Sequence, residues 1–198
     1  MLLGPCLSEP RRRNMIIEAI FSTLDENGKP NFAPMGLVWG DEFITVRPFR
    51  NTHTCRNLLS SGYGVANLTH DVLAYVRCGL YEEVLPYFPA KVVQGVVFRE
   101  ACSWREMAVV SHGGSDDRAE LRCRVVHKGW QKDFLGFCRA DNAVIEATIL
   151  ATRLAVYGRK TVAEKLSCYR EIVDKTGDET EKQAFQIVQD YVQEKEDR

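Results

Sequence analysis

The chain has 198 residues, 45% of them hydrophobic, which is enough for one full core with an appended element. Its formal net charge of −1 provides no overall field that would attract nucleic acid or an anionic membrane. We therefore expect the partner to be a small molecule or another protein, with neither nucleic acid nor membrane as a partner.

Strand patterns dominate the first fifty residues. Residues 15–25 (MIIEAIFSTLD) are rich in β-branched and aromatic side chains, and the Asn27-Gly28 pair that follows is typical of a tight hairpin turn. A second strand is predicted from Pro30 to Gly40, antiparallel to the first. After the Gly40-Asp41 turn, a third strand is predicted from Phe43 to Phe49.

Short helices alternate with strands in the next fifty residues. A helix is predicted from Thr52 to Ser61, closed by Gly62, and a strand from Tyr63 to Thr69. Asp71 is expected to cap a helix over residues 72–81, after which Pro86 and Pro89 break the pattern. The stretch from Val92 to Arg99 is apolar on both faces, so we predict a strand buried on two sides.

Two more strands, over residues 104–111 and 118–127, flank a turn rich in glycine and aspartate. In the second strand charged and apolar residues alternate strictly, as expected when one face is solvated. Six or seven strands joined by hairpins and short helices favour a closed antiparallel barrel, since closure removes exposed edges. The predicted fold class is α+β, mainly β.

The hydrophobic period becomes helical after Asp141. Val144, Ala147, Thr148 and Ala151 lie three or four positions apart, which predicts a well-buried helix that continues to Tyr157. Further helices are predicted over residues 161–175 and 179–194. We therefore divide the chain into a barrel domain, residues 1–140, and a C-terminal helical subdomain, residues 141–198, expected to stabilise the barrel and not to take part in the chemistry.

Arginines and threonines cluster where the third strand leads into the first short helix. Arg47, Arg50, Thr52 and Thr54 offer charged donors, hydroxyls and free helix N-terminal amides, the donor set that a phosphate group accepts. The alternatives are that the threonines only cap the helix and that the arginines are solvated charges at the barrel rim. Asn67 lies in an otherwise apolar strand and must have a hydrogen-bond partner, structural or ligand.

These segments resemble the flavin-reductase-like FMN-binding split barrel. The resemblance is carried by Ala33-Pro34-Met35-Gly36, Arg50-Asn51-Thr52-His53-Thr54 and Val65-Ala66-Asn67-Leu68. With its helical tail the chain is most similar to the mostly archaeal FMN-binding split-barrel proteins grouped as a family of unknown function. The resemblance implies FMN as cofactor, a homodimer with the flavin near the subunit interface, and a flavin site made of Met35, Gly36, Arg47, Pro48, Phe49, Arg50, Thr52, Thr54, Asn57, Asn67 and Thr69.

Other sites find little support in the sequence. His53 and Cys55 have no third or fourth ligand at zinc-type spacing, so no metal is expected. No Ser-His-Asp order, nucleophile elbow, GxGxxG motif or P-loop is present, and no catalytic residue is assigned. Trp104 and Trp130 are interpreted as core or dimer-contact residues.

Seven cysteines are scattered without a CxxC pair. An oxidising compartment would be hazardous for such a set, so we expect a reduced cytoplasm and mostly buried thiols, with native disulfides as the alternative. The arginines at positions 11–13 do not precede an apolar stretch, so they do not match a signal peptide. They are interpreted as a solvated arm or a second anion-contacting element.

The leading hypothesis is an FMN-dependent oxidoreductase or flavin reductase that accepts electrons from a reduced nicotinamide or deazaflavin donor. Its other small-molecule partner would be the electron acceptor, which the sequence does not identify. A second hypothesis is a non-enzymatic FMN carrier. A third is a cofactor-free module that binds another phosphorylated metabolite.

Overall fold

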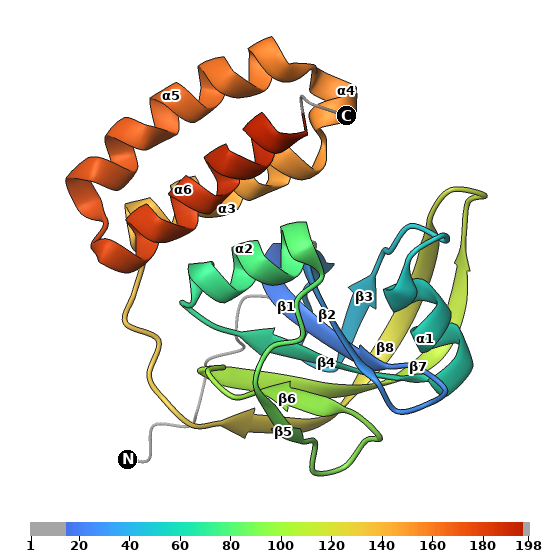
Figure 1. Ribbon diagram of the computed structural model, residues 1–198. Helices are drawn as coiled ribbons and strands as arrows, with labels where there is room; N and C mark the ends of the chain where they lie inside the picture. Colours follow the sequence, from blue (N-terminus) through green and yellow to red (C-terminus); the bar gives the residue numbers. More distant parts are fainter. Residues whose placement is uncertain (1–14, 196–198) are drawn as a thin grey trace, which may run out of the picture.

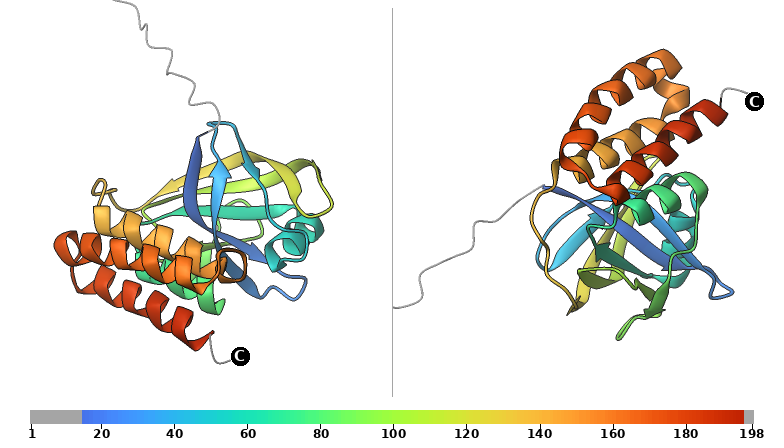
Figure 2. Two further views of the ribbon diagram at one scale, coloured as in Figure 1. Left: turned by 90° about the horizontal axis from the view of Figure 1, so that it is seen from above. Right: turned by 60° about the vertical axis from the view of Figure 1, so that its left-hand side comes forward.

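A computed structural model describes residues 15–195. Six strands form a barrel: β1 (Ile16–Leu24), β2 (Pro30–Val38), β3 (Phe43–Val46), β4 (Tyr63–Leu68), β7 (Ser103–Gly114) and β8 (Ala119–Trp130). They pair antiparallel in the closed order β1, β2, β3, β8, β7, β4 (Figures 1 and 2). The predicted fold class, an antiparallel barrel with C-terminal helices, is confirmed. The arginines at positions 11–13 lie outside the described residues.

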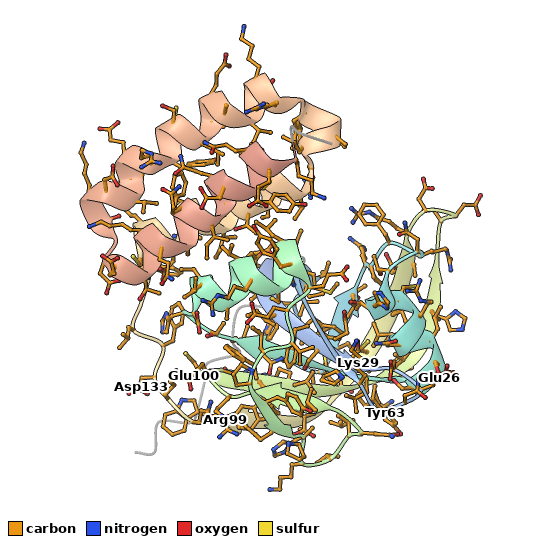
Figure 3. All side chains as sticks on the ribbon, in the orientation of Figure 1. Glu26, Lys29, Tyr63, Arg99, Glu100 and Asp133 are labelled. Carbon is orange, nitrogen blue, oxygen red and sulfur yellow. The ribbon has the colours of Figure 1, made fainter. Side chains whose placement is uncertain are left out.

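The hairpin between β1 and β2 forms at the predicted Asn27-Gly28 pair. Gly28 has a φ of 78°, a left-handed conformation that glycine adopts without strain. The Asp25 carboxylate accepts hydrogen bonds from the backbone N–H groups of Asn27 and Lys29, at 2.9 and 2.8 Å. The charged side chains of the turn, Glu26 and Lys29, are exposed at the edge of the barrel (Figure 3). Local sequence therefore determines this turn and, through it, the register of the two strands.

Two short helices, α1 (His53–Ser61) and α2 (Val72–Tyr81), follow β3 and β4 as predicted. Thr52 caps α1, and Gly62 ends it in the left-handed conformation with a φ of 74°. The Asp71 carboxylate caps α2 by accepting a hydrogen bond from the backbone N–H of Ala74 at 2.8 Å. Thr52, Gly62 and Asp71 are thus the capping residues that the sequence places at the helix ends.

The segment between α2 and β7 differs from the prediction. It contains a two-stranded sheet, β5 (Tyr87–Pro89) paired with β6 (Val96–Phe98), in place of one strand over residues 92–99. Pro89 does not break the pattern, because it ends an edge strand, where a missing N–H is tolerated. The three residues of β6 are buried, so the predicted burial on both faces is confirmed for this shorter strand. Likewise, β3 ends at Val46, three residues before the predicted end.

Residues 91–95, of which 92–95 were predicted as strand, form a loop that is held by Glu106 of β7. The Glu106 side chain is fully buried, and its carboxylate accepts hydrogen bonds from the Trp104 indole at 3.3 Å and from three backbone N–H groups, those of Lys91 (2.9 Å), Val92 (2.6 Å) and Val93 (3.1 Å). Burial raises the pKa of Glu106, but the four donors outweigh burial, so the pKa lies below its ordinary value. The loop therefore depends on an ionised carboxylate.

Four helices follow the barrel: α3 (Arg139–Thr152), α4 (Leu154–Tyr157), α5 (Arg159–Thr176) and α6 (Glu179–Glu194). Helices α3 and α6 pack on α2, which lies between the barrel and the other helices (Figure 1). One buried apolar cluster joins Val72 and Val76 of α2 to Val144 and Ala147 of α3 and to Val188 of α6. The barrel domain and the C-terminal helices thus share a hydrophobic core.

The predicted helix from Val144 to Tyr157 is interrupted. It ends at Thr152, and Arg153, with φ −111° and ψ 22°, separates α3 from the short helix α4. The predicted core positions of α3 are buried, whereas α4 has no buried residue and Val156 is 78% exposed. The apolar pattern therefore extends in sequence beyond the point at which the helix still faces the core.

Within residues 15–195, no helix combines the length and the apolar character needed to cross a membrane. The six cysteines in this part of the chain are free thiols. Four of them, Cys55, Cys78, Cys102 and Cys123, are buried, while Cys138 is half-buried and Cys168 exposed. The prediction of mostly buried thiols is confirmed for the described cysteines.

Candidate functional site

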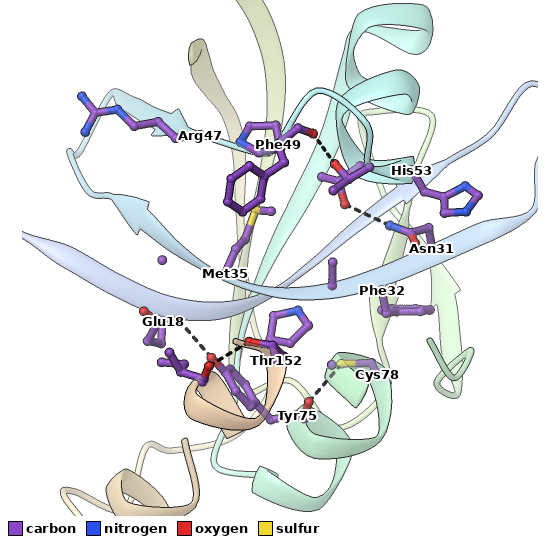
Figure 4. Close-up of a pocket in the computed structure, with 18 of the residues that line it drawn as sticks. Glu18, Asn31, Phe32, Met35, Arg47, Phe49, His53, Tyr75, Cys78 and Thr152 are labelled. Carbon is purple, nitrogen blue, oxygen red and sulfur yellow. Dashed lines mark hydrogen bonds between the residues drawn. The ribbon is translucent and has the colours of Figure 1, made fainter. Parts of the chain in front are cut away.

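A pocket of about 690 Å³ opens between the barrel and the end of α3 (Figure 4). It is lined by β2, the loop between β3 and α1, α2, and the carboxyl end of α3. Its volume lies within the range of about 300 to 1,000 Å³ that small-molecule sites occupy. Seven predicted site residues line it: Met35, Gly36, Arg47, Pro48, Phe49, Thr52 and Thr54.

Strand β2 forms one wall and has an open backbone edge. It pairs with β1 along its whole length, but the described pairing with β3 is limited to Val38 opposite Thr45. The segment from Ala33 to Gly36 lies in the pocket wall where β2 and β3 diverge, so its backbone is accessible to a ligand. A Cβ atom on Gly36 would approach Ile16 Cγ2 to 2.6 Å, so glycine allows the β1 side chains to lie close over this wall.

The amino end of α1 forms a second part of the wall, next to β2. Thr52 Oγ1 accepts a hydrogen bond from the Cys55 N–H at 3.3 Å and donates one to the Phe49 carbonyl at 2.7 Å, so Thr52 is the helix cap. Thr54 is buried, and its Oγ1 accepts a hydrogen bond from Asn31 Nδ2 at 3.1 Å. Within the described part of the chain the Thr54 hydroxyl donates no hydrogen bond, so its hydrogen is available to an anion beside the free first-turn amides.

The arginines of this region have distinct roles. Arg47 Nε forms an exposed ion pair with Glu120 at 2.8 Å. Arg50 does not line the pocket, because its guanidinium donates to the Ser115 carbonyl at 2.7 Å and so holds the turn between β7 and β8. Arg118, which the sequence analysis did not single out, lines the pocket and lies 3.9 Å from the centre of the Phe49 ring. The only indication in the sequence was that Arg118 begins the predicted strand in which charged and apolar residues alternate.

Asn57, Asn67 and Thr69, which the resemblance implies for the flavin site, do not line this pocket. The Asn57 carboxamide donates to Thr23 Oγ1 at 3.0 Å, and the Thr69 hydroxyl donates to the Glu100 carbonyl at 3.1 Å. Asn67 is fully buried, donates to the Ile20 carbonyl at 2.9 Å and accepts from the Phe98 N–H, also at 2.9 Å. Its predicted partner is therefore structural: the side chain ties β1, β4 and β6 together.

A carboxylate and a phenol that the sequence analysis missed also line the pocket. The hydroxyl of Tyr75, a buried residue of α2, donates to Glu18 Oε2 at 3.0 Å (Figure 4). Burial and the neighbouring Glu18 carboxylate raise the pKa of Tyr75, so the phenol stays protonated. No sequence motif could have indicated this pair, because the two residues are 57 positions apart.

The carboxyl end of α3 supplies the last part of the wall, through Ile149, Thr152 and Arg153. Thr152 Oγ1 donates to the Ile149 carbonyl at 2.8 Å and thereby turns its hydroxyl back onto the helix. These residues belong to the subdomain that the sequence analysis expected to have a purely stabilising role. The C-terminal subdomain therefore forms part of the pocket wall, which does not by itself decide whether it takes part in the chemistry.

Among residues 15–195, no three His, Cys, Asp or Glu side chains are placed to hold a metal ion together. His53 is not paired with Cys55. Its Nδ1 lies 3.1 Å from Arg56 Nη2.

Known structures share this architecture. An FMN-bound protein from Methanosarcina mazei is 28% identical, with a TM-score of 0.79 over 90% of this chain and 96% of that one. An FMN-binding protein from Thermus thermophilus with bound p-hydroxybenzaldehyde is 18% identical, with a TM-score of 0.51 over 66% of this chain and 80% of that one. Nitrilotriacetate monooxygenase component B from Bacillus cereus is 21% identical, also with a TM-score of 0.51, over 66% and 82%. The last two show a shared fold alone.

Two family models match adjacent parts of the chain. Residues 17–132 match the protein of unknown function (DUF447) N-terminal domain, and residues 138–190 match the protein of unknown function (DUF447). The Methanosarcina mazei protein belongs to the same family. The predicted relationship to split-barrel flavoproteins with a C-terminal helical extension is confirmed, and the chain belongs to the DUF447 family.

Proposed function

We propose that this protein is an FMN-dependent oxidoreductase or flavin reductase. The observation that carries the proposal is the pocket itself, in which the open edge of β2 and the amino end of α1 line one space of about 690 Å³. The 28% identical structure from Methanosarcina mazei, which matches over 90% of this chain, holds FMN. A flavin here would supply the electron-transfer chemistry by accepting a hydride, with its two electrons, and a proton.

The residues present suit the two ends of FMN. The free hydrogen of the Thr54 hydroxyl and the first-turn amides of α1 would hold the terminal phosphate, and Arg118 adds positive charge to the same wall. The backbone from Ala33 to Gly36 would lie against the ring, because small residues permit close approach. Phe49, half exposed at 50%, provides an apolar surface beside it.

Binding should discriminate FMN from riboflavin. Charge-assisted hydrogen bonds contribute about 1.5 to 3 kcal/mol each, so we expect riboflavin to bind at least about tenfold more weakly. Thr54→Val should reduce this difference by weakening FMN alone, whereas Thr54→Ser, which keeps the hydroxyl, should bind like the wild type. Titration of the apoprotein, followed by quenching of flavin fluorescence, measures both dissociation constants.

Thr161→Val, on the exposed surface of α5, is the matched control and should change neither constant. Equal affinities of the wild type for the two flavins would contradict the phosphate assignment. A purified protein with no affinity for either flavin would instead favour the third hypothesis, a module for another phosphorylated metabolite.

Turnover distinguishes an enzyme from an FMN carrier. The FMN-loaded protein, mixed anaerobically with a reduced nicotinamide or reduced deazaflavin, should lose its flavin absorbance within seconds. A carrier would keep its absorbance with both donors. The six free thiols of the described chain are compatible with the cytoplasmic placement that forms part of this proposal.

We further propose a homodimer in which the partner covers the mouth of the pocket. Ile16 and Phe49 both line the pocket and are 61% and 50% exposed, so we expect them to give its mouth an apolar rim. Ile16→Glu should therefore yield a monomer in sedimentation equilibrium and weaken FMN binding. Leu135→Glu, at a 91% exposed residue outside the pocket lining, should remain dimeric. The reverse result would place the dimer contact away from the flavin.

A further inference from the structure

Part of the pocket lining has no role in the proposed FMN site. The proposed FMN site uses β2 and the amino end of α1, while α2 and the carboxyl end of α3 present Tyr75, Thr152 and Arg153 to the same space. Helix α2 packs closely on both β2 and α3. A Cβ atom on Gly79 would lie 2.9 Å from Pro34 Cγ in β2 and 3.4 Å from Thr148 Cγ2 in α3. Packing of α2 against both β2 and α3 therefore fixes the position of the α3 end relative to the proposed ring site.

Arg153 differs from the other arginines that line the pocket. Arg47 is paired with Glu120, and Arg118 lies over the Phe49 ring. Among the residues that the structure describes, no carboxylate, carbonyl or ring engages the Arg153 guanidinium, whose side chain is exposed. A position at the end of α3 suits a cation, because the helix dipole is negative there, but this uses none of the five N–H donors of the guanidinium.

The charges around Arg153 restrict what it would bind. Glu18 and Glu82 also line the pocket, so the uncharged part of a ligand must lie beside them. Glu18 already accepts the Tyr75 hydroxyl through Oε2, and it can accept an N–H of a neutral ring substituent as well. A negative group is favoured at Arg153, whose planar guanidinium binds phosphate in a bidentate manner.

We propose that the carboxyl end of α3 is the electron-donor subsite and that Arg153 binds the phosphate of a phosphate-bearing hydride donor. This inference rests on the proposed flavin function and adds the class of the second reactant. A reduced nicotinamide dinucleotide and a phosphorylated reduced deazaflavin share this chemistry. In either case the donor loses a hydride and becomes oxidised, while the bound flavin gains that hydride and a proton from water. The C-terminal subdomain, in this view, determines donor specificity.

The test compares charged and neutral donors on the FMN-loaded full chain. The charged donors are NADH and reduced 5-deazaflavin mononucleotide, and their neutral counterparts are 1-benzyl-1,4-dihydronicotinamide and reduced 5-deazariboflavin. Anaerobic stopped-flow spectroscopy measures the rate of flavin reduction against donor concentration. The variants are Arg153→Ala, Arg153→Lys and the control Arg139→Ala, which removes an exposed arginine at the opposite end of α3.

For at least one charged donor, Arg153→Ala should raise the half-saturating concentration at least tenfold and leave the limiting rate within twofold. The neutral counterpart and the FMN dissociation constant should be unchanged, Arg153→Lys should lie between, and Arg139→Ala should match the wild type. The inference is overturned if Arg153→Ala has no effect, if it affects charged and neutral donors equally, or if neither charged donor reduces the wild-type flavin. Failure to bind FMN, measured separately, would overturn the proposed function and this inference with it.

Discussion

A chain that ends at Cys138 is expected to aggregate and to lose its affinity for FMN. Val72 and Val76 of α2 are buried in the cluster that α3, α5 and α6 complete, and removal of these helices would expose both. Burial of each valine contributes about 1.5 to 3 kcal/mol, so the loss of several such contacts approaches the total stability of about 5 to 15 kcal/mol of a typical domain. Light scattering and flavin titration of the shortened chain measure the two effects.

Point variants in the full chain distinguish the loss of core packing from other effects of shortening the chain. Val144→Asp places a charge at a position with 0% exposure in the shared cluster and should unfold the protein near room temperature. Val156→Asp makes the same change at a 78% exposed position of α4 and should alter the melting temperature by less than about 2 °C. A folded, FMN-binding barrel in the shortened chain, or equal effects of the two aspartates, would contradict the shared core.

Glu106→Gln should lower the free energy of unfolding by about 3 kcal/mol or more at pH 7. The buried carboxylate accepts four hydrogen bonds, and a carboxamide would turn an N–H group toward donors that need an acceptor. Glu100→Gln, which removes an exposed ion pair with Lys132, is the matched control and should cost less than about 1 kcal/mol. Urea unfolding followed by tryptophan fluorescence measures both.

The difference between wild type and Glu106→Gln should depend on pH in one direction. Because the folded pKa of Glu106 lies below its ordinary value, ionisation stabilises the folded state above the unfolded pKa of about 4.3. This stabilisation is lost as the pH falls through the folded pKa, so the two proteins should begin to converge once the pH falls below the unfolded pKa. A difference that stays constant from pH 7 to pH 3 would show that folding does not lower the pKa of this carboxylate.

The structural elements that the sequence predicted well are those decided by local interactions. The Asn27-Gly28 turn, the Thr52 and Asp71 caps and the bounds of α2 and α6 depend on residues within a few positions of one another. The pattern around Arg47 to Thr54 also indicated one side of the pocket, because a strand that leads into a helix amino end has a recognisable composition.

The elements that the sequence placed wrongly depend on distant partners. Residues 91–95 form a loop because a carboxylate from another strand, Glu106, satisfies their amides. Arg50 and Asn67 have polar side chains in suggestive positions, but the β7–β8 turn and the edge of β6 engage them. The type of a polar side chain indicates which groups it can hydrogen-bond, but the tertiary structure determines which of those groups lies within reach.

The amino-acid sequence by itself determined the barrel, the helical tail and the group of potential phosphate-binding donors at the start of α1. Each of these depends on hydrophobic periodicity or on residues that are neighbours in the sequence. Tertiary structure alone decided that the tail would reach the pocket. Arg153 lies more than a hundred positions from Gly36, and the two line one cavity only because α3 packs on α2 and α2 packs on β2. The two halves of the site are brought together by the packing of apolar faces. An apolar face can be recognised in the sequence, but the sequence around it does not indicate which other face it packs against.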